Sequence, residues 1–314
     1  MKSRIQIGIT ARNEEVTIGE TLSSLLPAIH RAENETPLLF DSIVILDDCT
    51  DRTGEIARGF GVRTLVSSGG IVEAQRHLSG ATPFVVFCDA DIFIEEPALA
   101  ALCRTMLDNP ALQVAYAAKT PLPPRSRSLL AEALYCYNRV NGFQHERRYF
   151  NGRFFAIRDW QVPTLAELQP RLARLPVNRF YDFHAGMRID DIYLSRDILR
   201  RHGPDAIREV PGARIRFRPP ESCAGMYQTY RRMRLEIERL DILFPETKPA
   251  HQHRGYDWTA VRRAPARDRV LWRVFRLTLG VCMARYAAER FYYQHFATDF
   301  CPAWPPILES KVPS

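Results

Sequence analysis

Short apolar runs alternate with helical patterns along the first part of the chain. Runs of apolar, often β-branched residues predict strands, and apolar residues that recur every three or four positions predict helices. The predicted strands span residues 5–9, 42–46, 61–66, 84–88 and 114–118. The predicted helices span residues 17–26, 53–60, 72–78 and 97–107. This alternation predicts an α/β fold with a single, mostly parallel, Rossmann-like sheet, right-handed crossovers and flanking helices.

The pattern of the remaining chain is less regular. Helices are predicted at residues 129–139, 189–199, 226–240 and 268–296, and strands at 150–157 and 208–217. Residues 162–179 and 245–267 are rich in Pro and Arg and are predicted to be irregular. Since no internal repeat or clean linker is visible, we expect a catalytic domain over residues 1–240. Residues 241–314 are expected to form a C-terminal loop and helical extension packed on it.

Polar clusters follow three of the predicted strands. They are Arg12-Asn13-Glu14, Asp47-Asp48 and Asp89-Ala90-Asp91. Ligands of parallel α/β sheets bind at the carboxyl ends of the strands. The sequence therefore predicts a ligand site where these clusters meet. The helix after the first cluster is expected to begin with a capping box of Thr17 and Glu20.

Asp89 and Asp91 are the candidate metal ligands. Mg²⁺ and Mn²⁺ prefer oxygen ligands and usually keep substrate phosphates as partners, so two carboxylates behind a buried strand suit such an ion. The alternative is a solvated turn that happens to carry two acidic residues. His251 and His253 lie in a predicted loop and could supply a further ligand, although their two-residue spacing is a weak signal.

Two other acidic pairs each have two interpretations. Asp47 or Asp48 could accept the ring N–H of a pyrimidine base, or the segment could be a turn with Asp51 as the N-cap of the next helix. Asp190 and Asp191 open a predicted helix. One of them could be a general base whose pKa is raised by its neighbour, or the pair could be a capping feature favoured by the helix dipole.

A basic segment, Gln228-Thr229-Tyr230-Arg231-Arg232, lies in the predicted helix 226–240. An arginine here could bind a diphosphate leaving group through two hydrogen bonds. It could equally pair with Glu236 and Glu238 on a solvated helix face.

Composition narrows the possible partners. The formal net charge is +7, from 43 Lys and Arg against 36 Asp and Glu, and the charge is scattered, which disfavours a nucleic-acid partner and suits a phosphorylated substrate. The seven cysteines include no Cys-x-x-Cys pair, which argues against a zinc site and a disulfide framework. No secretory signal and no run of about 20 apolar residues is visible, so we expect a cytoplasmic protein.

Taken together, the clusters resemble family-2 glycosyltransferases with the GT-A fold. Each segment is a weak motif alone, but their order and spacing along residues 4–240 are specific. The segments are ITARNEEVTIGETLSSL (9–25), VILDDCTDRTGEIA (44–57), FVVFCDADIFIEEPAL (84–99), FNGRFFAIR (150–158), IDDIYLSRDI (189–198) and the Gln228–Arg231 pair.

The resemblance implies a nucleoside-diphosphate-sugar donor, with UDP favoured, a hydroxyl acceptor, and Mn²⁺ or Mg²⁺ on Asp89 and Asp91. It implies that Asp191, next to Asp190, is the base of a single inverting displacement, and that Gly152 leaves room for substrate. The remaining residues implied to bind the nucleotide-sugar are Thr10, Ala11, Arg12, Glu14, Asp47, Asp48, Gln75, Asp89, Ala90, Gln228, Arg231 and Arg232.

The sequence departs from the family pattern at several positions. Thr10 replaces a common Pro, Cys49 a common Gly or Asn, and Gln75 lies where Lys or Arg is frequent. Arg232 stands where the motif of processive synthases has Trp, so a non-processive enzyme is expected.

Alternatives remain. A retaining enzyme of similar fold and a catalytically silent nucleotide-binding protein share these motifs. A nucleotidyltransferase should carry a Gly-rich, Lys-containing loop after the first strand, which this chain lacks. The predicted helix 268–296 carries Arg269, Arg273 and Arg276, and could pack on the catalytic domain or make a peripheral contact with an anionic membrane that presents a lipid-linked acceptor.

Overall fold

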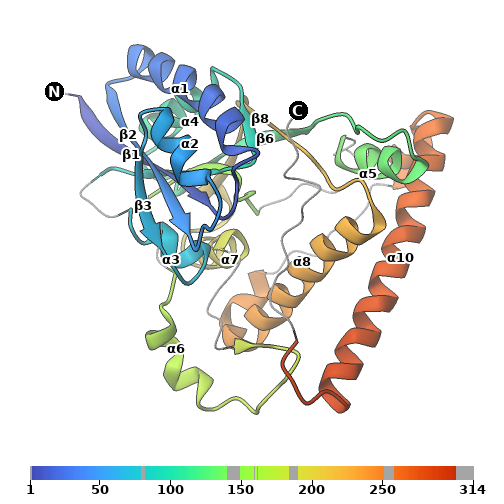
Figure 1. The fold of residues 1–314 in the computed structure, drawn as a ribbon. Helices are drawn as coiled ribbons and strands as arrows, with labels where there is room; N and C mark the ends of the chain where they lie inside the picture. Colours follow the sequence, from blue (N-terminus) through green and yellow to red (C-terminus); the bar gives the residue numbers. More distant parts are fainter. Residues whose placement is uncertain are drawn as a thin grey trace.

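A computed structural model describes residues 2–78, 82–139, 149–158, 160, 162–183, 190–250 and 258–301 of the protein. Within these residues the protein contains an eight-stranded sheet with the strand order β3-β2-β1-β4-β7-β6-β8-β5, and Figure 1 labels five of these strands. The strands are β1 (Ser3–Ala11), β2 (Leu38–Asp47), β3 (Arg63–Ser67), β4 (Val85–Asp89), β5 (Ile92–Ile94), β6 (Val114–Pro121), β7 (Phe154–Ile157) and β8 (Ile207–Phe217).

The sheet is mostly parallel, as predicted. The pairs β3–β2, β2–β1, β1–β4 and β6–β8 are parallel. Strand β7 runs antiparallel to both β4 and β6, and β5 runs antiparallel to β8. The three-residue strand β5 was not predicted, because its only partner, β8, is more than a hundred positions away in sequence.

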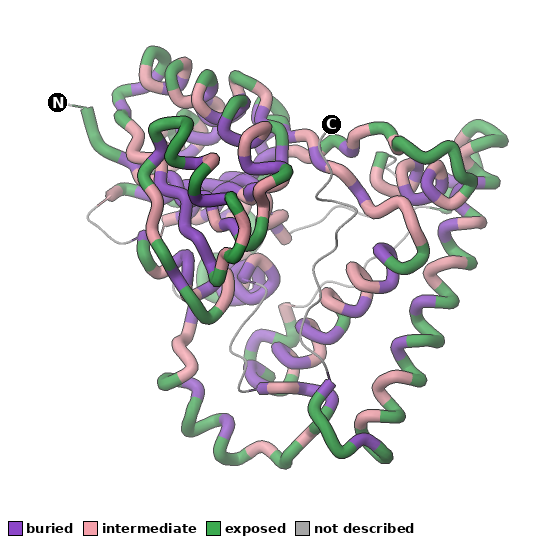
Figure 2. The backbone as a smooth tube through the Cα atoms, viewed as in Figure 1, coloured by how far each residue is buried: buried purple, intermediate pink, exposed green. Residues whose placement is uncertain are grey.

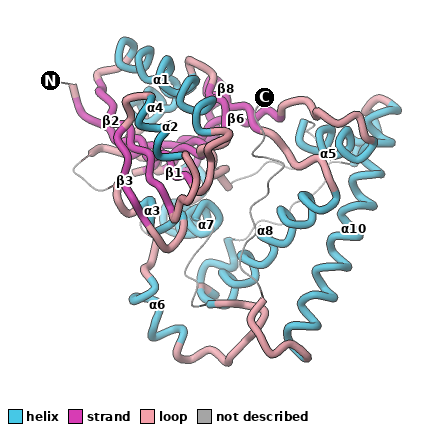
Figure 3. Tube along the Cα trace, viewed as in Figure 1, coloured by secondary structure: helices cyan, strands magenta, loops and turns pink. Residues whose placement is uncertain are grey.

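Helices cover both faces of the sheet (Figure 3). Alternate residues of a strand point to opposite faces, so Val44 and Leu46 of β2 join one core cluster and Ile43 and Ile45 join the other. The first cluster includes residues of α1 (Ile18–Glu35), α2 (Thr53–Gly59) and α4 (Ala98–Asp108). The second includes residues of α3 (Ile71–Gln75), α5 (Leu129–Arg139) and α7 (Asp190–His202). Burial on both faces explains why the strands are read as continuous apolar runs.

The second core cluster continues into the C-terminal helices. Helix α8 (Cys223–Leu243) lies beside α10 (Ala266–His295), and α10 also packs on α5. Tyr137 of α5 stacks on Phe275 of α10 with ring centroids 3.9 Å apart. Buried and exposed positions alternate along α10, as Figure 2 shows. Within the described residues, α10 thus contacts α5 and α8.

Several local predictions are wrong. Residues 162–179 are not wholly irregular, because Thr164 and Glu167 form a capping box that starts α6 (Leu165–Leu172). No capping box forms at Thr17, whose hydroxyl donates instead to the Glu14 carboxylate at 2.9 Å. Residues 245–267 include a 3₁₀ helix (Pro245–Ala250) and α9 (Trp258–Arg263). The strand expected over 150–157 is only β7, Phe154–Ile157.

No helix among the described residues could cross a bilayer, since even the longest, the 30-residue α10, lacks a sufficiently long apolar stretch.

Candidate active site

Strands β1, β2 and β4 end at one edge of the sheet. In the strand register Thr10 lies opposite Asp89 on one side and opposite Ile45 on the other. Asp47 is the last residue of β2, and Asp89 is the last residue of β4. The three polar clusters predicted from the sequence therefore emerge at neighbouring positions of the same edge.

Asp89 and Asp91 share one cationic partner, Arg153. The Nη1 atom of Arg153 lies 3.1 Å from Asp91 Oδ1 and 3.6 Å from Asp89 Oδ2. The backbone N–H of Asp89 also donates to the Arg153 carbonyl at 2.8 Å, so the arginine's backbone is held beside the pair. Its guanidinium lies over the Phe217 ring at 4.7 Å from the centroid. Sequence reasoning missed Arg153, although it directly follows the predicted site residue Gly152.

Asp190 and Asp191 occupy the first turn of α7. Asp190 is buried, and its Oδ2 accepts a 2.6 Å hydrogen bond from Gln75 Nε2. Asp191 Oδ2 accepts a 3.1 Å bond from the backbone N–H of Gly152. Gln75 therefore orients Asp190, a contact not anticipated when Gln75 was selected as a donor-binding residue.

Gly152 makes room for the catalytic candidate itself. A Cβ atom at this position would lie 3.0 Å from Asp191 Cβ and 3.3 Å from Asp191 Oδ2. A side chain at Gly152 would thus crowd Asp191, and the role of Gly152 toward substrate stays a prediction.

The charges of three neighbouring carboxylates act on Asp89. Burial raises the pKa of Asp89 well above its ordinary value, and the negative charges of Asp91, Asp190 and Asp191 raise it further, against the opposing effect of Arg153. Burial and the charge of Asp190 raise the pKa of Asp191 to about 7. Burial likewise raises the pKa of Asp190. Residues a hundred positions apart in sequence thus form one acidic centre.

This centre fits a divalent cation. Asp89 and Asp91 offer hard oxygen ligands, and positive charge added beside Asp89 would stabilise its ionised carboxylate, whose pKa burial raises. Within the described ranges no group of three or more His, Cys, Asp or Glu side chains is arranged to hold a metal ion. An ion on this pair would therefore rely on phosphate or water oxygens for its other ligands. His251 and His253 lie outside the described residues.

The two aspartates after β2 have different surroundings. Asp47 is 4% exposed, its Oδ1 accepts a 2.9 Å bond from Gly70 N–H, and its Oδ2 lies 3.8 Å from Arg12 Nη1. Burial raises the pKa of Asp47. Asp48 is exposed, in a left-handed conformation with φ 47°. We conclude that Asp47 mainly supports the loop, and that Asp48 is the better placed to meet a ligand.

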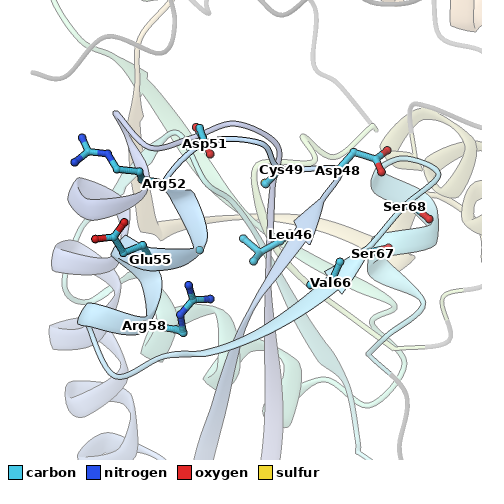
Figure 4. A pocket seen from close by; sticks show the side chains of 11 residues that line it. Leu46, Asp48, Cys49, Asp51, Arg52, Glu55, Arg58, Val66, Ser67 and Ser68 are labelled. Carbon is cyan, nitrogen blue, oxygen red and sulfur yellow. The ribbon is translucent and has the colours of Figure 1, made fainter.

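Asp48 also lines a cavity of about 520 Å³ (Figure 4). Cys49, Arg52, Arg58 and Ser68 are among the other lining residues. None of the four carboxylates of the acidic centre lines this cavity. The residues of the acidic centre, and not those that line this cavity, are therefore the candidates for catalysis.

The loop after β1 is tied to the loop after β2. Glu14 N–H donates to Thr53 Oγ1 at 2.8 Å, and Glu15 N–H donates to Asp51 Oδ2 at 3.0 Å. Asp51 Oδ1 accepts from Thr53 N–H at 3.0 Å, although Arg52 rather than Asp51 occupies the N-cap position of α2. The prediction of Asp51 as the cap residue is thus wrong by one position, while its carboxylate still holds the first turn. These bonds position Ala11, Arg12 and Glu14 at the site edge.

Arg231 and Arg232 of α8 have separate environments. Arg231 is buried, with Nε 2.9 Å from Glu289 Oε1 of α10 and Nη2 2.7 Å from Cys301 Sγ. The guanidinium of Arg231 therefore forms an ion pair with Glu289, and its contact with a diphosphate stays a prediction. Glu236 pairs with Arg239, and Glu238 with Arg234 and Arg290.

Arg232 is half-buried and faces the acidic centre. Desolvation lowers the pKa of its guanidinium, and its charged neighbours include Asp91, Arg153, Asp89 and Glu14. Gln228 lies one helical turn earlier and is also half-buried. Of the two arginines of α8 predicted to bind the diphosphate, Arg232 is thus the one near the candidate metal ligands.

Residues 6–175, more than half of the chain, match the sequence model of glycosyl transferase family 2. The protein belongs to this family. The family expectation from the sequence is thus confirmed, and so is the assignment of the protein as a glycosyltransferase. No curated protein matches the sequence.

Solved structures with a similar fold include glucosyl-3-phosphoglycerate synthase from Mycobacterium tuberculosis. Its complex with Mn²⁺, UDP-glucose and phosphoglyceric acid is 20% identical over 77% of this chain and 80% of that chain, with a TM-score of 0.46. Its complex with UDP is 21% identical over 78% and 80% of the two chains, also with a TM-score of 0.46. Its complex with Mg²⁺ and UDP is 24% identical over 67% and 69%, with a TM-score of 0.40. The predicted α/β fold with a single, mostly parallel sheet is confirmed by the strand order and pairing of this glycosyltransferase.

Proposed function

We propose that this glycosyltransferase is a metal-dependent, inverting, non-processive enzyme that transfers a sugar from a nucleoside-diphosphate-sugar to a hydroxyl acceptor. The observation that carries the proposal is the acidic centre at the carboxyl edge of the sheet, in which the charges of Asp91, Asp190 and Asp191 all act on Asp89. UDP is the favoured nucleotide, since the enzyme of similar fold binds UDP and UDP-glucose.

Asp89 and Asp91 hold the cation, Mn²⁺ or Mg²⁺, both of which occur in the complexes of similar fold. When bound, such an ion stabilises the negative charge that develops on the departing diphosphate. Arg232, with its charge beside Asp91 and Asp89, is placed to add a guanidinium to the same diphosphate. Arg231 contributes indirectly, because its pair with Glu289 holds α8, and thereby Arg232, against α10.

Asp191 takes the proton of the acceptor hydroxyl while the oxygen of that hydroxyl attacks the anomeric carbon of the donor sugar. A carboxylate with a pKa of about 7 is a stronger base than an ordinary aspartate and is still ionised at neutral pH in a useful fraction. The Gly152 N–H and the Gln75–Asp190 bond orient the acidic pair. One in-line displacement needs no covalent intermediate, so positioning supplies much of the rate.

The nucleotide binds at the edge formed by Thr10, Ala11, Arg12 and Glu14, with Asp48 directed to the base. The hydrogen bonds between the loops after β1 and β2 support this arrangement, because they hold both sides of the binding edge together. Ala90, between the two metal ligands, and Gln228, one turn before Arg232, complete the donor side. Residues 1–240 act as the catalytic domain, and residues 241–314 extend it.

A donor screen tests the proposal. The protein is incubated with Mn²⁺ and UDP-, GDP- and dTDP-sugars, and thermal shift and release of nucleoside diphosphate are measured. We expect the largest shift and release with a UDP-sugar, because a ligand that binds only the native state raises its stability. Thermal shifts without release for any donor, across a panel of acceptors, would favour the silent nucleotide-binding alternative. Analysis of the product anomer distinguishes inversion from retention.

A peripheral contact of α10 with an anionic membrane extends the proposal. Val270, Leu277, Val281 and Tyr292 are all more than half exposed on one side of this helix. The exposed Arg273 and Arg285 flank this apolar side, and acidic side chains of α10 are already paired, Asp268 with Arg139 and Glu289 with Arg231. Basic charge around exposed apolar residues suits an anionic lipid surface.

Co-sedimentation with vesicles tests this contact. Vesicles of phosphatidylglycerol should retain the protein, while neutral phosphatidylcholine vesicles and the variant Leu277→Ser should not show comparable binding. Equal binding to both vesicle types, or to neither, would end the membrane proposal. A cytoplasmic location is consistent with seven cysteines that are all free thiols.

A further inference from the structure

Arg153 lies where a cation would approach the candidate metal ligands. A single nitrogen, Nη1, contacts carboxylate oxygens of both Asp91, at 3.1 Å, and Asp89, at 3.6 Å. The backbone bond from Asp89 N–H to the Arg153 carbonyl, together with the Phe217 ring below the guanidinium, supports this placement. The contact is therefore part of the site's architecture and not a side chain lying loosely on the surface.

The positive charge beside the aspartate pair opposes a second cation. A divalent ion bound to both carboxylates would be repelled by the Arg153 guanidinium, and Arg232 adds a further positive charge from α8. The ion can bind both carboxylates closely only if the arginine leaves them. A guanidinium finds an equally good partner in a phosphate, which it can bind through two parallel hydrogen bonds.

We propose that Arg153 is a resident counter-ion that couples the binding of metal and nucleotide. In the nucleotide-free protein it neutralises Asp89 and Asp91 and keeps the affinity for a divalent cation low. A nucleoside diphosphate draws the guanidinium onto its phosphate oxygens and releases the carboxylates to the ion. Cation and nucleotide therefore bind with positive cooperativity. This inference rests on the proposed function, because it assumes that both ligands use this site.

The competing role for Arg153 is purely structural. If it held the two carboxylates in a geometry that the ion needs, its removal would weaken cation binding. If it is a counter-ion, its removal strengthens cation binding in the absence of nucleotide. The sign of the change in affinity therefore separates the two roles.

Calorimetric titration of the full-length protein with MnCl₂ measures this sign, with and without saturating UDP. For Arg153→Gln we expect Mn²⁺ affinity without UDP to rise by roughly tenfold or more, the scale expected for loss of one nearby like charge. UDP should strengthen Mn²⁺ binding markedly in the wild type and much less in this variant. Arg153→Lys, which keeps the charge, should stay close to the wild type.

Arg214→Gln is the matched control, since Arg214 is an exposed arginine of β8 whose guanidinium bonds the Pro211 carbonyl. It should leave both affinities unchanged, and circular dichroism confirms that each variant is folded. Unchanged or weaker Mn²⁺ binding by a folded Arg153→Gln would overturn the inference. If the wild type binds neither Mn²⁺ nor UDP, the proposed function itself is refuted, so the two failures are distinguishable.

Discussion

Replacing Asp191 by Asn should stabilise the protein at alkaline pH while it abolishes transfer. The pKa of Asp191 is raised from an ordinary value of 3.8 to about 7 by burial and by Asp190. Between these two pH values the native state holds a proton that the unfolded chain has lost. The free energy of unfolding therefore falls as pH rises through this window, and the stability of the protonated form is lost above about pH 7.

The magnitude follows from the shift. About three pKa units correspond to a ceiling of about 4 kcal/mol at 1.36 kcal/mol per unit. Asp191 keeps some exposure to solvent, which screens the charge, so we expect a gain of about 2 kcal/mol for Asp191→Asn at pH 8.5. Asparagine is uncharged at every pH, and its amide oxygen can still accept the bond from Gly152 N–H. At pH 4 the gain should be close to zero.

Urea unfolding at pH 4, 6 and 8.5, in EDTA, provides the assay. EDTA is needed because a bound cation would lower the carboxylate pKa values. The exposed Asp299, changed to Asn, is a control that should show no such pH-dependent gain. Equal free energies of unfolding for Asp191→Asn and the wild type at pH 8.5 would refute the reasoning that burial and the charge of Asp190 destabilise the ionised Asp191 carboxylate. In the wild type, kcat/KM should rise with pH along a limb at or below about pH 7, as the base ionises.

Three further substitutions address the surrounding contacts. Gly152→Ala places a Cβ 3.0 Å from Asp191 Cβ and so displaces the catalytic carboxylate, and we expect kcat to fall by about 10²-fold. A wild-type kcat in steady-state kinetics would contradict this. Arg231→Ala removes the cationic partner of Glu289 and should lower the free energy of urea unfolding by about 3 kcal/mol, whereas a change below 1 kcal/mol would mean that the ion pair contributes little to stability. Asp91→Asn should reduce transfer on the order of 10²-fold and weaken calorimetric Mn²⁺ binding; undiminished Mn²⁺ binding would exclude Asp91 as a ligand.

Local pattern was sufficient to predict most elements. The apolar runs of β1, β2 and β4 have no competing interpretation, because a strand buried on both faces is apolar at successive positions. Helix α5 begins and ends where it was predicted, at Leu129 and Arg139. The helix at residues 165–172 was not predicted, because Pro170 interrupts the apolar period of a short helix that begins with a capping box.

The sequence by itself determined that carboxylates follow neighbouring strands, since strand ends and acidic residues are both visible along the chain. Only the tertiary structure decided which side chains meet there. Arg153 reaches Asp89 and Asp91 because β7 pairs with β4 in antiparallel register, and no local pattern encodes that pairing. Arg231 and Arg232 are adjacent in sequence but point about 100° apart on a helix, so the packing of α8 against α10 assigns one to Glu289 and the other to the acidic centre.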